Sequence, residues 1–450
     1  MPISTPIYDF LTRYHDREGL RLHMPGHKGK PLFTGALGEA AALDLTEIEG
    51  SDSLYEASGV IAESERRTAA LFGASATAYS AGGSTLCIQA MLAMIAAQGG
   101  GTIIAARNVH RAFVSAAALL DLTVVWIYPD YAEGTLLSGE VSPVSVQAAL
   151  RAHPEARAVY LTSPDYLGVM TDIAAVSEVC RAAAVPLLVD AAHGSHLRFL
   201  ETDRHALTEG ADLCCNSAHK TLPAFTGAAY LHAGDTPFGR TFALRMKAAM
   251  SMFGSTSPSY LILASLDLCQ AYLREQGAAD IRTIAERADV LRDALRSQGW
   301  LVEEAEPLRV TVNGISRGQT GTSVAAALRK LGIECEYADS VHLVALLSPA
   351  MEEAELRRFA AAMAAIPQGE GEVLLPACAP LRLSAHTSLR EAVFRSSETL
   401  PVEACVGRVC AGVHVTCPPG VPLVVPGECI TPEAINILKS YSISSLNVLK

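Results

Sequence analysis

The sequence predicts an α/β fold built on a mostly parallel sheet, and two observations support that prediction. From about residue 61, apolar runs typical of strands alternate with stretches whose apolar residues recur at helical spacing. The strand candidates are continuously apolar rather than alternating, which is typical of a parallel sheet covered by helices on both faces. A small α/β domain and a C-terminal segment are expected to follow this large domain.

The elements of the large domain follow a regular order. A helix over 62–73 closes at Gly73 and leads into a short strand over 76–80. Further strands are expected at 102–106, 123–128, 158–162, 186–190, 211–217 and 227–232, and helices at 84–98, 111–120, 142–153 and 173–184.

The rest of the chain divides at changes in composition. The 450 residues exceed what one compact core usually accommodates, so several domains are expected. Helices at 261–273 and 280–299 lead to a small domain with strands at 309–314 and 341–348 and helices at 324–331 and 352–364. A linker rich in Pro and Gly follows at 367–372. The predicted parts are an N-terminal arm over 1–60, a large domain over 61–280, a small domain over 281–367 and a C-terminal domain over 368–450.

Charge and composition exclude several classes of protein. Half of the residues are apolar, and the formal charge of -12 opposes nucleic-acid binding, which needs a basic face. The acidic balance favours small cationic ligands. No signal peptide is visible at the start, and the most apolar stretch, Leu86 to Ala97, is shorter than the about 20 residues that span a bilayer. We therefore expect no membrane partner.

The cysteines indicate a reducing compartment. Eleven are present, without a CxxC pair or a repeated metal-ligand spacing. Cys214 and Cys215 are adjacent in an apolar run and are interpreted as buried thiols. We expect a cytoplasmic protein.

Ser84 and Thr85 form the first part of a candidate cofactor site. A strand ends near Ser80, two glycines permit a tight turn, and these two hydroxyl residues open the next helix. Free N–H groups and the helix dipole favour a phosphate at such a position. The same pattern also occurs as an ordinary helix cap, so alone it decides nothing.

Asp190 forms the second part. It ends a buried strand, where open α/β sheets place their ligands. A buried carboxylate needs a positive partner, and the protonated pyridine nitrogen of pyridoxal phosphate is one. The alternative is an Asp that caps the next loop. His193 and His196 resemble a metal pair, but no third ligand follows at a suitable spacing, so no metal is expected.

Lys220 forms the third part. It follows an apolar strand, thirty positions after Asp190, together with Ser217 and His219. Burial there favours the neutral amine, which forms imines with aldehydes. The alternative is a surface lysine in a turn. A phosphate loop, a strand-end Asp and a strand-end Lys in this order predict a site for pyridoxal phosphate.

The chain resembles the Orn/Lys/Arg decarboxylases of pyridoxal-phosphate (PLP) fold type I, the fold of aspartate aminotransferase. It resembles their short form, which lacks an N-terminal wing domain. The resemblance runs over nearly the whole length and in order. Its blocks are HMPGHKGK at 23–30, RNVHRAF at 107–113, TSPDYLGVMTDI at 162–173, VDAAHGSHLRF at 189–199, NSAHKTLPAFTG at 216–227, GSTSPSYLILASLD at 254–267 and PPGVPLVVPGECIT at 418–431.

The resemblance implies roles for the catalytic residues. Lys220 would hold the cofactor as a Schiff base, and Asp190 would hold the pyridine nitrogen. His110 would stack on the ring face, and His193 would pack near the ring. His219 or Lys220 would return a proton to Cα after carbon dioxide leaves.

The resemblance also implies binding residues. Ser84, Thr85, Ser217 and His219 would surround the phosphate and the approach to Lys220. Ser255 and Thr256 would reach a phosphate in the neighbouring subunit, because fold type I sites lie at a homodimer interface.

Glu428 is the first candidate to bind the cationic end of the substrate, and Glu47 and Asp52 are the second. Tyr55 and Glu56 stand where many relatives carry a histidine-containing sequence, which bears on side-chain specificity.

The expected reaction is decarboxylation of arginine, lysine or ornithine, and the sequence does not choose among them. An aminotransferase or a carbon–sulfur lyase would share the large-domain motifs, and a non-catalytic relative would share the fold. The PGHK arm and the PPG…PGE ending oppose the first alternative, and intact Lys220, Asp190 and His110 oppose the second. A nucleotide-binding oxidoreductase is excluded because no GxGxxG joins a first strand to a helix.

Overall fold

The computed structural model describes residues 4–17, 19–131, 134–369, 381–413 and 420–450. The chain groups into two compact units. The first unit comprises Met1–Met94 and Leu188–Ile281, and the second comprises Ile95–Leu187 and Arg282–Lys450. Each unit is therefore built from two separate stretches of sequence. The expected linker over 367–372 lies partly outside the described residues, and the four-part domain division stays a prediction.

The first unit holds the strands that carry the candidate site. They are β1 (Ala76–Ser80), β7 (Leu187–Asp190), β8 (Leu213–Asn216) and β9 (Ala229–Ala233), and they pair in the order β1-β9-β8-β7. β7 and β8 are parallel, as expected for continuously apolar strands. β9 is antiparallel to both of its neighbours, β1 and β8, and is an exception in a mostly parallel sheet.

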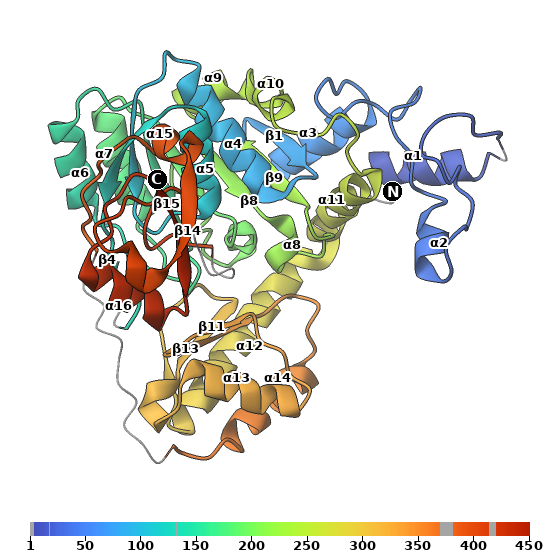
Figure 1. The fold of residues 1–450 in the computed structure, drawn as a ribbon. Helices are drawn as coiled ribbons and strands as arrows, with labels where there is room; N and C mark the ends of the chain where they lie inside the picture. The colour runs from blue at the N-terminus through green and yellow to red at the C-terminus, as the bar shows by residue number, and fades with distance from the viewer. Residues whose placement is uncertain (1–3, 18, 132–133, 370–380, 414–419) are drawn as a thin grey trace. The chain divides into compact units, whose positions relative to one another are not determined.

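Helices of the first unit pack around an apolar core that includes Phe72, Tyr79, Tyr230 and Tyr260. The arm is more ordered than its weak periodicity suggested, since α1 contacts both α3 and α11 (Figure 1). The helices of this unit are α1 (Pro6–His15), α2 (Ala36–Ala40), α3 (Val60–Phe72), α4 (Gly83–Ala96), η1 (Ser195–Phe199), α8 (Ala218–Thr221), α9 (Pro237–Ala243), α10 (Met246–Ser251), α11 (Tyr260–Tyr272) and η2 (Leu273–Gly277).

The second unit holds three parallel strands, β2 (Thr102–Ala106), β3 (Thr123–Ile127) and β6 (Ala158–Thr162), paired in the order β6-β2-β3. The helices α5 (Arg111–Leu119), α6 (Pro143–Ala152) and α7 (Ile173–Ala182) alternate with them along the chain, and a short hairpin joins β4 (Asp130–Tyr131) to β5 (Gly139–Glu140). This is the strand–helix alternation that the sequence predicts.

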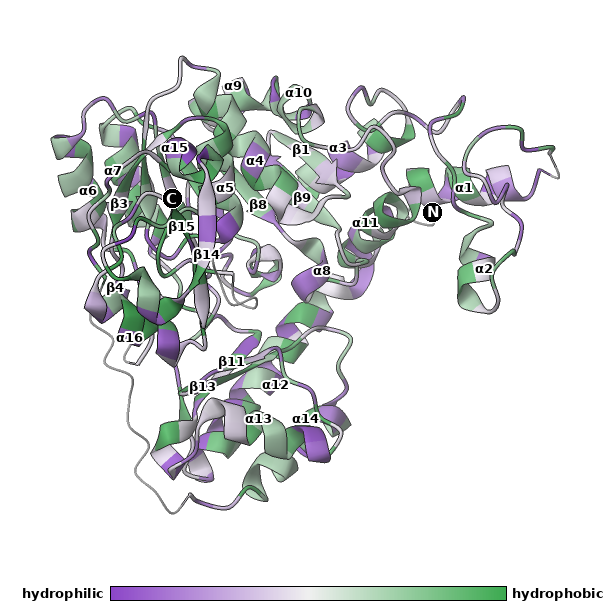
Figure 2. Ribbon diagram, viewed as in Figure 1, coloured by the Kyte–Doolittle hydropathy of each residue, from purple (hydrophilic) through white to green (hydrophobic). Residues whose placement is uncertain are grey.

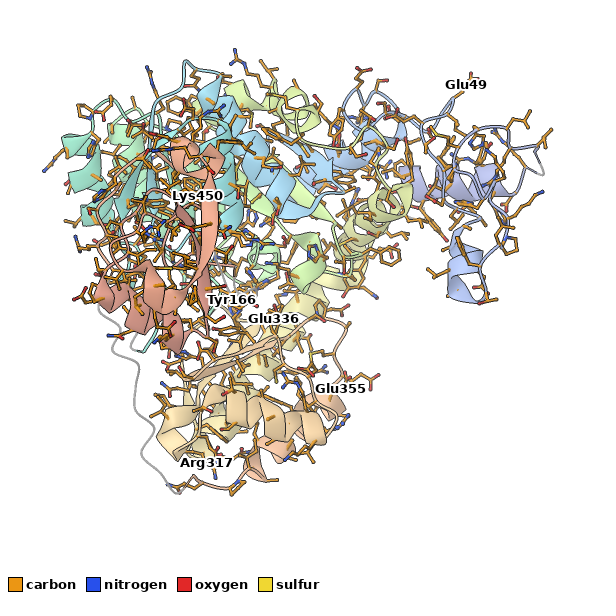
Figure 3. The ribbon with its side chains drawn as sticks, in the orientation of Figure 1. Glu49, Tyr166, Arg317, Glu336, Glu355 and Lys450 are labelled. Atoms are coloured by element: carbon orange, nitrogen blue, oxygen red, sulfur yellow. The ribbon has the colours of Figure 1, made fainter. Side chains whose placement is uncertain are left out.

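An antiparallel sheet follows in the second unit. Its order is β10-β11-β13-β12, from β10 (Leu301–Val302), β11 (Arg309–Asn313), β12 (Tyr337–Ala338) and β13 (His342–Leu346). It shares a core with α12 (Ala278–Ser297), α13 (Gly321–Lys330) and α14 (Glu353–Ala364), and η3 (Gly314–Arg317) follows β11. Tyr166 donates to Glu336 at 2.9 Å and thereby ties the loop after β6 to this sheet (Figure 3).

The C-terminal part of the second unit has its own core. β14 (Ser397–Pro401) pairs with β15 (Ser445–Leu449), and α16 (Pro432–Ser440) packs its apolar residues, green in Figure 2, into this core. η4 (Val402–Cys405) adds Val402 and Cys405 to this core, whereas α15 (Leu389–Phe394) contacts α5. Within the described residues, no helix combines the length and the apolar composition needed to cross a bilayer.

Candidate active site

Asp190 and Lys220 follow two adjacent parallel strands of the first unit. β7 ends at Asp190, which lies opposite Cys215 of β8. Directly after β8, the chain turns into the short helix α8 and brings Lys220 one turn beyond the strand end. The carboxyl ends of parallel strands meet at one edge of a sheet, so both side chains belong to the edge at which such sheets bind ligands.

The Asp190 carboxylate is buried, with 2% of the residue exposed. Its Oδ1 accepts a hydrogen bond from the Ala192 N–H at 3.1 Å and from the Cys215 thiol at 3.4 Å. Across the described part of the chain, no donor pairs with Oδ2, and no cationic side chain pairs with the carboxylate. The residue thus has neutral partners on one oxygen and a second oxygen open to a ligand.

The Lys220 amine lies beside a histidine that the sequence also indicated. Lys220 Nζ and His193 Nε2 are 2.7 Å apart. His193 follows Asp190 by three residues and is itself buried. The structure therefore brings Asp190, His193 and Lys220 to one strand-end region, with His193 able to hold a proton of the lysine amine.

Ser84 and Ser217, two of the residues expected to surround a phosphate, are in direct contact. Ser217, at the end of β8, donates to Ser84 at the start of α4, at 2.8 Å between the hydroxyl oxygens. Gly83 opens that helix with φ of +67°, a conformation that L side chains rarely adopt. Strand end and helix start thus present adjacent hydroxyl groups at the helix N-terminus, a position that favours an anion.

His219 has a defined tautomer. Its Nδ1 lies 2.8 Å from the Ala228 carbonyl oxygen and must donate, because a carbonyl only accepts. Burial lowers the pKa of His219, the hydrogen bond to Ala228 raises it, and nearby Lys220 lowers it further. The imidazole is therefore neutral near pH 7, with Nε2 as an acceptor.

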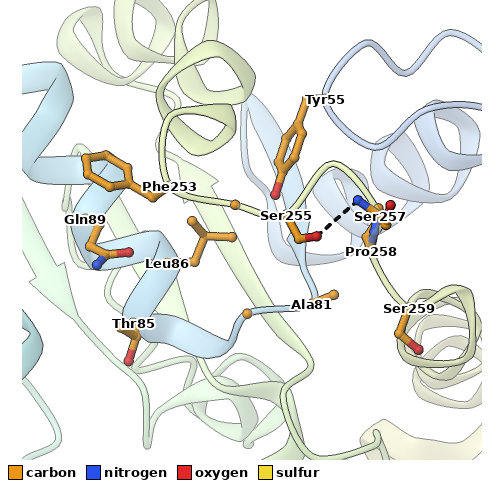
Figure 4. Close-up of a pocket in the computed structure, with 12 residues that line it drawn as sticks. Tyr55, Ala81, Thr85, Leu86, Gln89, Phe253, Ser255, Ser257, Pro258 and Ser259 are labelled. Carbon is orange, nitrogen blue, oxygen red and sulfur yellow. Dashed lines mark hydrogen bonds between the residues drawn. The ribbon is translucent and has the colours of Figure 1, made fainter.

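Thr85 and Ser255 line one pocket of the first unit, with a volume of about 230 Å³ (Figure 4). Gln89 of α4 and Tyr55 line it too, and the Ser257 N–H donates to the Ser255 hydroxyl at 3.1 Å. The pocket lining carries hydroxyl and amide groups without a charged side chain. Ser255 and Thr256 are exposed in the single chain. Their expected reach to a neighbouring subunit stays a prediction.

His110 belongs to the second unit, where it caps α5. Its Nδ1 accepts a hydrogen bond from the Ala112 N–H at 3.2 Å. The structure therefore shows that His110 caps the helix. Its stacking on the cofactor ring stays a prediction.

Glu428, the first candidate to bind the substrate cation, forms a buried ion pair with Arg107. Its Oε2 lies 3.2 Å from Arg107 Nη2 and accepts the Val425 N–H at 2.8 Å, and only 3% of the residue is exposed. This carboxylate already has its counter-ion within the chain. Its contact with the substrate stays a prediction, whereas the ion pair with Arg107 is observed.

Asp52 and Glu47, the second candidates for the substrate cation, have structural partners. The Asp52 carboxylate accepts from the backbone N–H groups of Ser53, Ser58, Gly59, Ile61 and Ala62. Burial raises the pKa of Asp52, but the hydrogen bonds from Ser58, Gly59, Ser53 and Ala62 together lower it below its usual value. Asp52 therefore caps the N-terminus of α3. Glu47 accepts from the Ser53 hydroxyl at 2.8 Å.

Sequence reasoning missed two residues of these regions. Cys215 was expected only as a buried thiol, and it is buried, but it also donates to Asp190. The register of β7 against β8 could have indicated this contact, because the two residues end adjacent strands. Arg107 opens the RNVHRAF block, and nothing in that block indicates its partner. No group of three or more His, Cys, Asp or Glu side chains within the described residues could hold a metal ion.

Comparison with protein families gives two matches in chain order. Residues 5–315 match the Orn/Lys/Arg decarboxylase major domain, and residues 376–444 match the Orn/Lys/Arg decarboxylase C-terminal domain. Among characterised relatives, an arginine decarboxylase of Bacillus subtilis (strain 168) is 30% identical over 97% of this chain and 93% of its own length. An arginine decarboxylase of Halalkalibacterium halodurans is 29% identical over 99% of this chain and 95% of its own.

Solved structures agree on the fold. The lysine decarboxylase LdcF of Francisella novicida superposes with a TM-score of 0.82 at 18% identity, covering 100% of this chain and 81% of that one. An alanine–glyoxylate aminotransferase from Nostoc sp. gives a TM-score of 0.56 at 19% identity, covering 68% of this chain and 85% of that one. The fold is thus PLP fold type I, and, with both family domains present in order, the chain belongs to the Orn/Lys/Arg decarboxylase family.

Proposed function

We propose that this protein decarboxylates a basic amino acid, using pyridoxal phosphate held by Lys220. The observation behind the proposal is the pair of strand ends that carry Asp190 and Lys220, together with the open Oδ2 of a buried carboxylate. The names of the relatives, arginine and lysine decarboxylases, support the substrate class.

The residues present fit this cofactor on three counts. A buried carboxylate without a cationic partner among the described residues suits a protonated pyridine nitrogen, since the ligand then supplies the positive charge. A lysine amine with an adjacent histidine suits imine formation. The Ser84 and Ser217 hydroxyls at the start of α4 suit a phosphate.

When bound, pyridoxal phosphate supplies an electron sink for the electrons of the broken bond between Cα and the carboxylate. The Asp190 carboxylate would accept a hydrogen bond from the protonated pyridine nitrogen through Oδ2, and its negative charge would keep that nitrogen protonated. Ala192 and Cys215 hold Oδ1 and so fix the plane of the carboxylate. The Ser84 and Ser217 hydroxyls would hold the phosphate group.

Lys220 is the better of the two candidate proton donors to Cα. Neutral His219 has its one ring proton on Nδ1, where it is bound to the Ala228 carbonyl. The Lys220 amine instead lies 2.7 Å from His193 Nε2, within reach for a proton to pass between the two nitrogens. We therefore assign proton return to Lys220, with His193 as its partner.

A shared cofactor leaves other reactions to test. An aminotransferase or a carbon–sulfur lyase would use the same strand-end residues, and a non-catalytic relative would keep the fold without turnover. The match of residues 376–444 to the decarboxylase C-terminal domain favours decarboxylation, because this domain is not part of the large domain that fold type I enzymes share.

Product identification tests the proposal. Purified protein loaded with pyridoxal phosphate is incubated separately with arginine, lysine and ornithine, without a keto acid. We expect release of labelled carbon dioxide from the carboxyl carbon and the matching amine by mass spectrometry, and neither with Lys220→Ala. Turnover that requires a keto acid acceptor would instead establish transamination. Cofactor uptake without turnover of any of the three substrates would contradict the proposal.

Location and assembly extend the proposal. We propose a cytoplasmic homodimer in which Ser255 and Thr256 complete the phosphate site of the partner. The exposure of both residues, and the absence of disulfide bonds among the nine described cysteines, support this.

A further inference from the structure

The loop after β2 is held by the segment Gly420–Glu428, more than 300 residues later in the chain. The Arg107 guanidinium donates to the Pro422 carbonyl at 2.6 Å and to the Leu423 carbonyl at 2.8 Å, and it pairs with Glu428 at 3.2 Å. Arg107 and Glu428 are both buried. A buried fork of this kind fixes the two segments against each other, because losing any contact leaves a charged group unsatisfied.

A second contact reaches His110 directly. The Arg111 N–H donates to the Gly420 carbonyl at 2.7 Å, so Gly420 lies against the start of α5. A Cβ on Gly420 would lie 2.7 Å from His110 Nε2 and 2.8 Å from its Cδ2. Gly420 also has φ of +75°. Both the space and the backbone conformation therefore require glycine here.

His110 is thus held from two sides. Its Nδ1 accepts from the Ala112 N–H, which fixes the ring to the helix start and leaves the proton of the neutral ring on Nε2. The backbone of Gly420 faces that Nε2 edge. The Ala112 N–H and the Gly420 backbone are both uncharged, and together they restrict the orientation of the imidazole.

We propose that the segment Gly420–Glu428 positions His110. The backbone of Gly420 packs against the imidazole and limits its orientation, and the Arg107–Glu428 ion pair holds the segment in place. Gly420, Arg107 and Glu428 are then positioning residues for the proposed reaction, on which this inference rests. The C-terminal domain acts on the reaction by setting the imidazole that is expected to stack on the cofactor.

Two glycine variants, one at Gly420 and one at a control position, test whether Gly420 positions His110. Gly407 has φ of +76° and open space where a Cβ would lie, so Gly407→Ala carries the same backbone strain without meeting a histidine. For Gly420→Ala we expect kcat/KM and the affinity for pyridoxal phosphate to fall on the order of 10- to 100-fold. For Gly407→Ala we expect both to stay within about twofold.

A double-variant cycle with His110→Ala separates positioning from general damage. Without the imidazole, the added methyl group has room, so Gly420→Ala should lower cofactor affinity less than about twofold further in that background. Arg107→Lys, which keeps the cation and loses the fork, runs through the same cycle and keeps the test informative should Gly420→Ala not fold. The absorbance of the bound cofactor is recorded for every variant.

The outcomes are distinguishable. Coupling of Gly420→Ala or Arg107→Lys to His110→Ala in cofactor affinity and spectrum supports the inference. Equal losses with and without His110, or a loss in Gly407→Ala as large as in Gly420→Ala, overturn it and leave the proposed function intact. Wild-type protein that takes up no pyridoxal phosphate overturns both.

Discussion

Asp190 and Glu428 are two buried carboxylates with opposite surroundings. Among the described residues, the partners of Asp190, in the first unit, are an N–H and a thiol, both on Oδ1. Glu428, in the second unit, has a buried arginine at 3.2 Å and a backbone N–H. Burial raises the pKa of Glu428, and Arg107 opposes that rise.

The difference separates a ligand site from a structural contact. A carboxylate that folding buries without a cation is costly unless a ligand brings the charge, whereas one paired within the chain stabilises the fold as it stands. Asp190 therefore fits a cofactor partner, and Glu428 fits an anchor. Sequence position alone suggested a ligand for both.

Lys220→Ala should give the largest effect. Removing the amine should lower kcat on the order of 10⁴-fold, about 5 kcal/mol of barrier, and abolish the visible absorbance of the bound cofactor. Steady-state assays and absorbance spectra check this. Near-normal turnover would remove Asp190 from the role of cofactor partner as well, because the two residues are proposed to hold one ring.

Asp190→Asn tests whether Asp190 binds a ligand or, like Glu428, serves the fold. The amide keeps the Oδ1 acceptor and removes the charge, so kcat should fall on the order of 10³-fold, about 4 kcal/mol of barrier. The thermal midpoint of the cofactor-free protein should stay level or rise, since a buried uncompensated charge is removed. A clear loss of stability without cofactor would show that Asp190 has a structural role like that of Glu428.

Glu428→Gln should show the reverse pattern. The buried Arg107 loses its counter-ion, and the cost is expected to be about 3 kcal/mol of stability. Thermal melting and hydrogen exchange of the segment around Gly420 measure it, with the exposed pair variant Glu353→Gln as control. A Glu428→Gln protein as stable as the wild type, with a raised KM for one basic amino acid only, would favour the substrate role instead.

A buried histidine of the first unit, His205, is expected to make the folded protein less stable at acid pH. Burial lowers the pKa of His205 from 6.5 to about 4. Its Nε2 lies 2.8 Å from Asn216 Oδ1, and Asn216 in turn donates to the Ala191 carbonyl beside Asp190. Protonation is therefore resisted in the folded state near the proposed site.

The sign of the effect follows from the lowered pKa. The unfolded chain takes up the proton first, so stability is full above pH 6.5 and falls as the pH drops toward 4, by roughly 3 kcal/mol. Thermal midpoints across this range should fall steeply in the wild type and less steeply in His205→Gln. Parallel curves for the two proteins would contradict this assignment.

Much of the fold was predictable because strands and helices here carry simple periodicity. The strands β1, β2 and β6 begin and end where their apolar runs do. The direction of β9 was not predictable, since an apolar strand reads alike in either direction. The short helix α1 was missed because much of its stability comes from tertiary contacts such as Asp267, which accepts the Ile7 N–H at 2.8 Å.

The candidate site divides in the same way. Asp190, His193, Lys220, Ser84 and Ser217 lie at or just after strand ends or at a helix start, and such positions are visible in local sequence patterns. The partner of Glu428 was not predictable, because Arg107 lies 321 residues earlier and only the folded chain brings the two charges together. The cap formed by Asp52 was hidden for a related reason, since its carboxylate reaches N–H groups up to ten residues away.

Covalent trapping of the cofactor tests the central claim most directly. Wild-type protein and Asp190→Asn are incubated with pyridoxal phosphate, reduced with borohydride, digested and mapped by mass spectrometry. We predict one pyridoxyl group, on the peptide that contains Lys220, with markedly less label in Asp190→Asn at limiting cofactor. Label on a different lysine, or no label at saturating cofactor, would contradict the account.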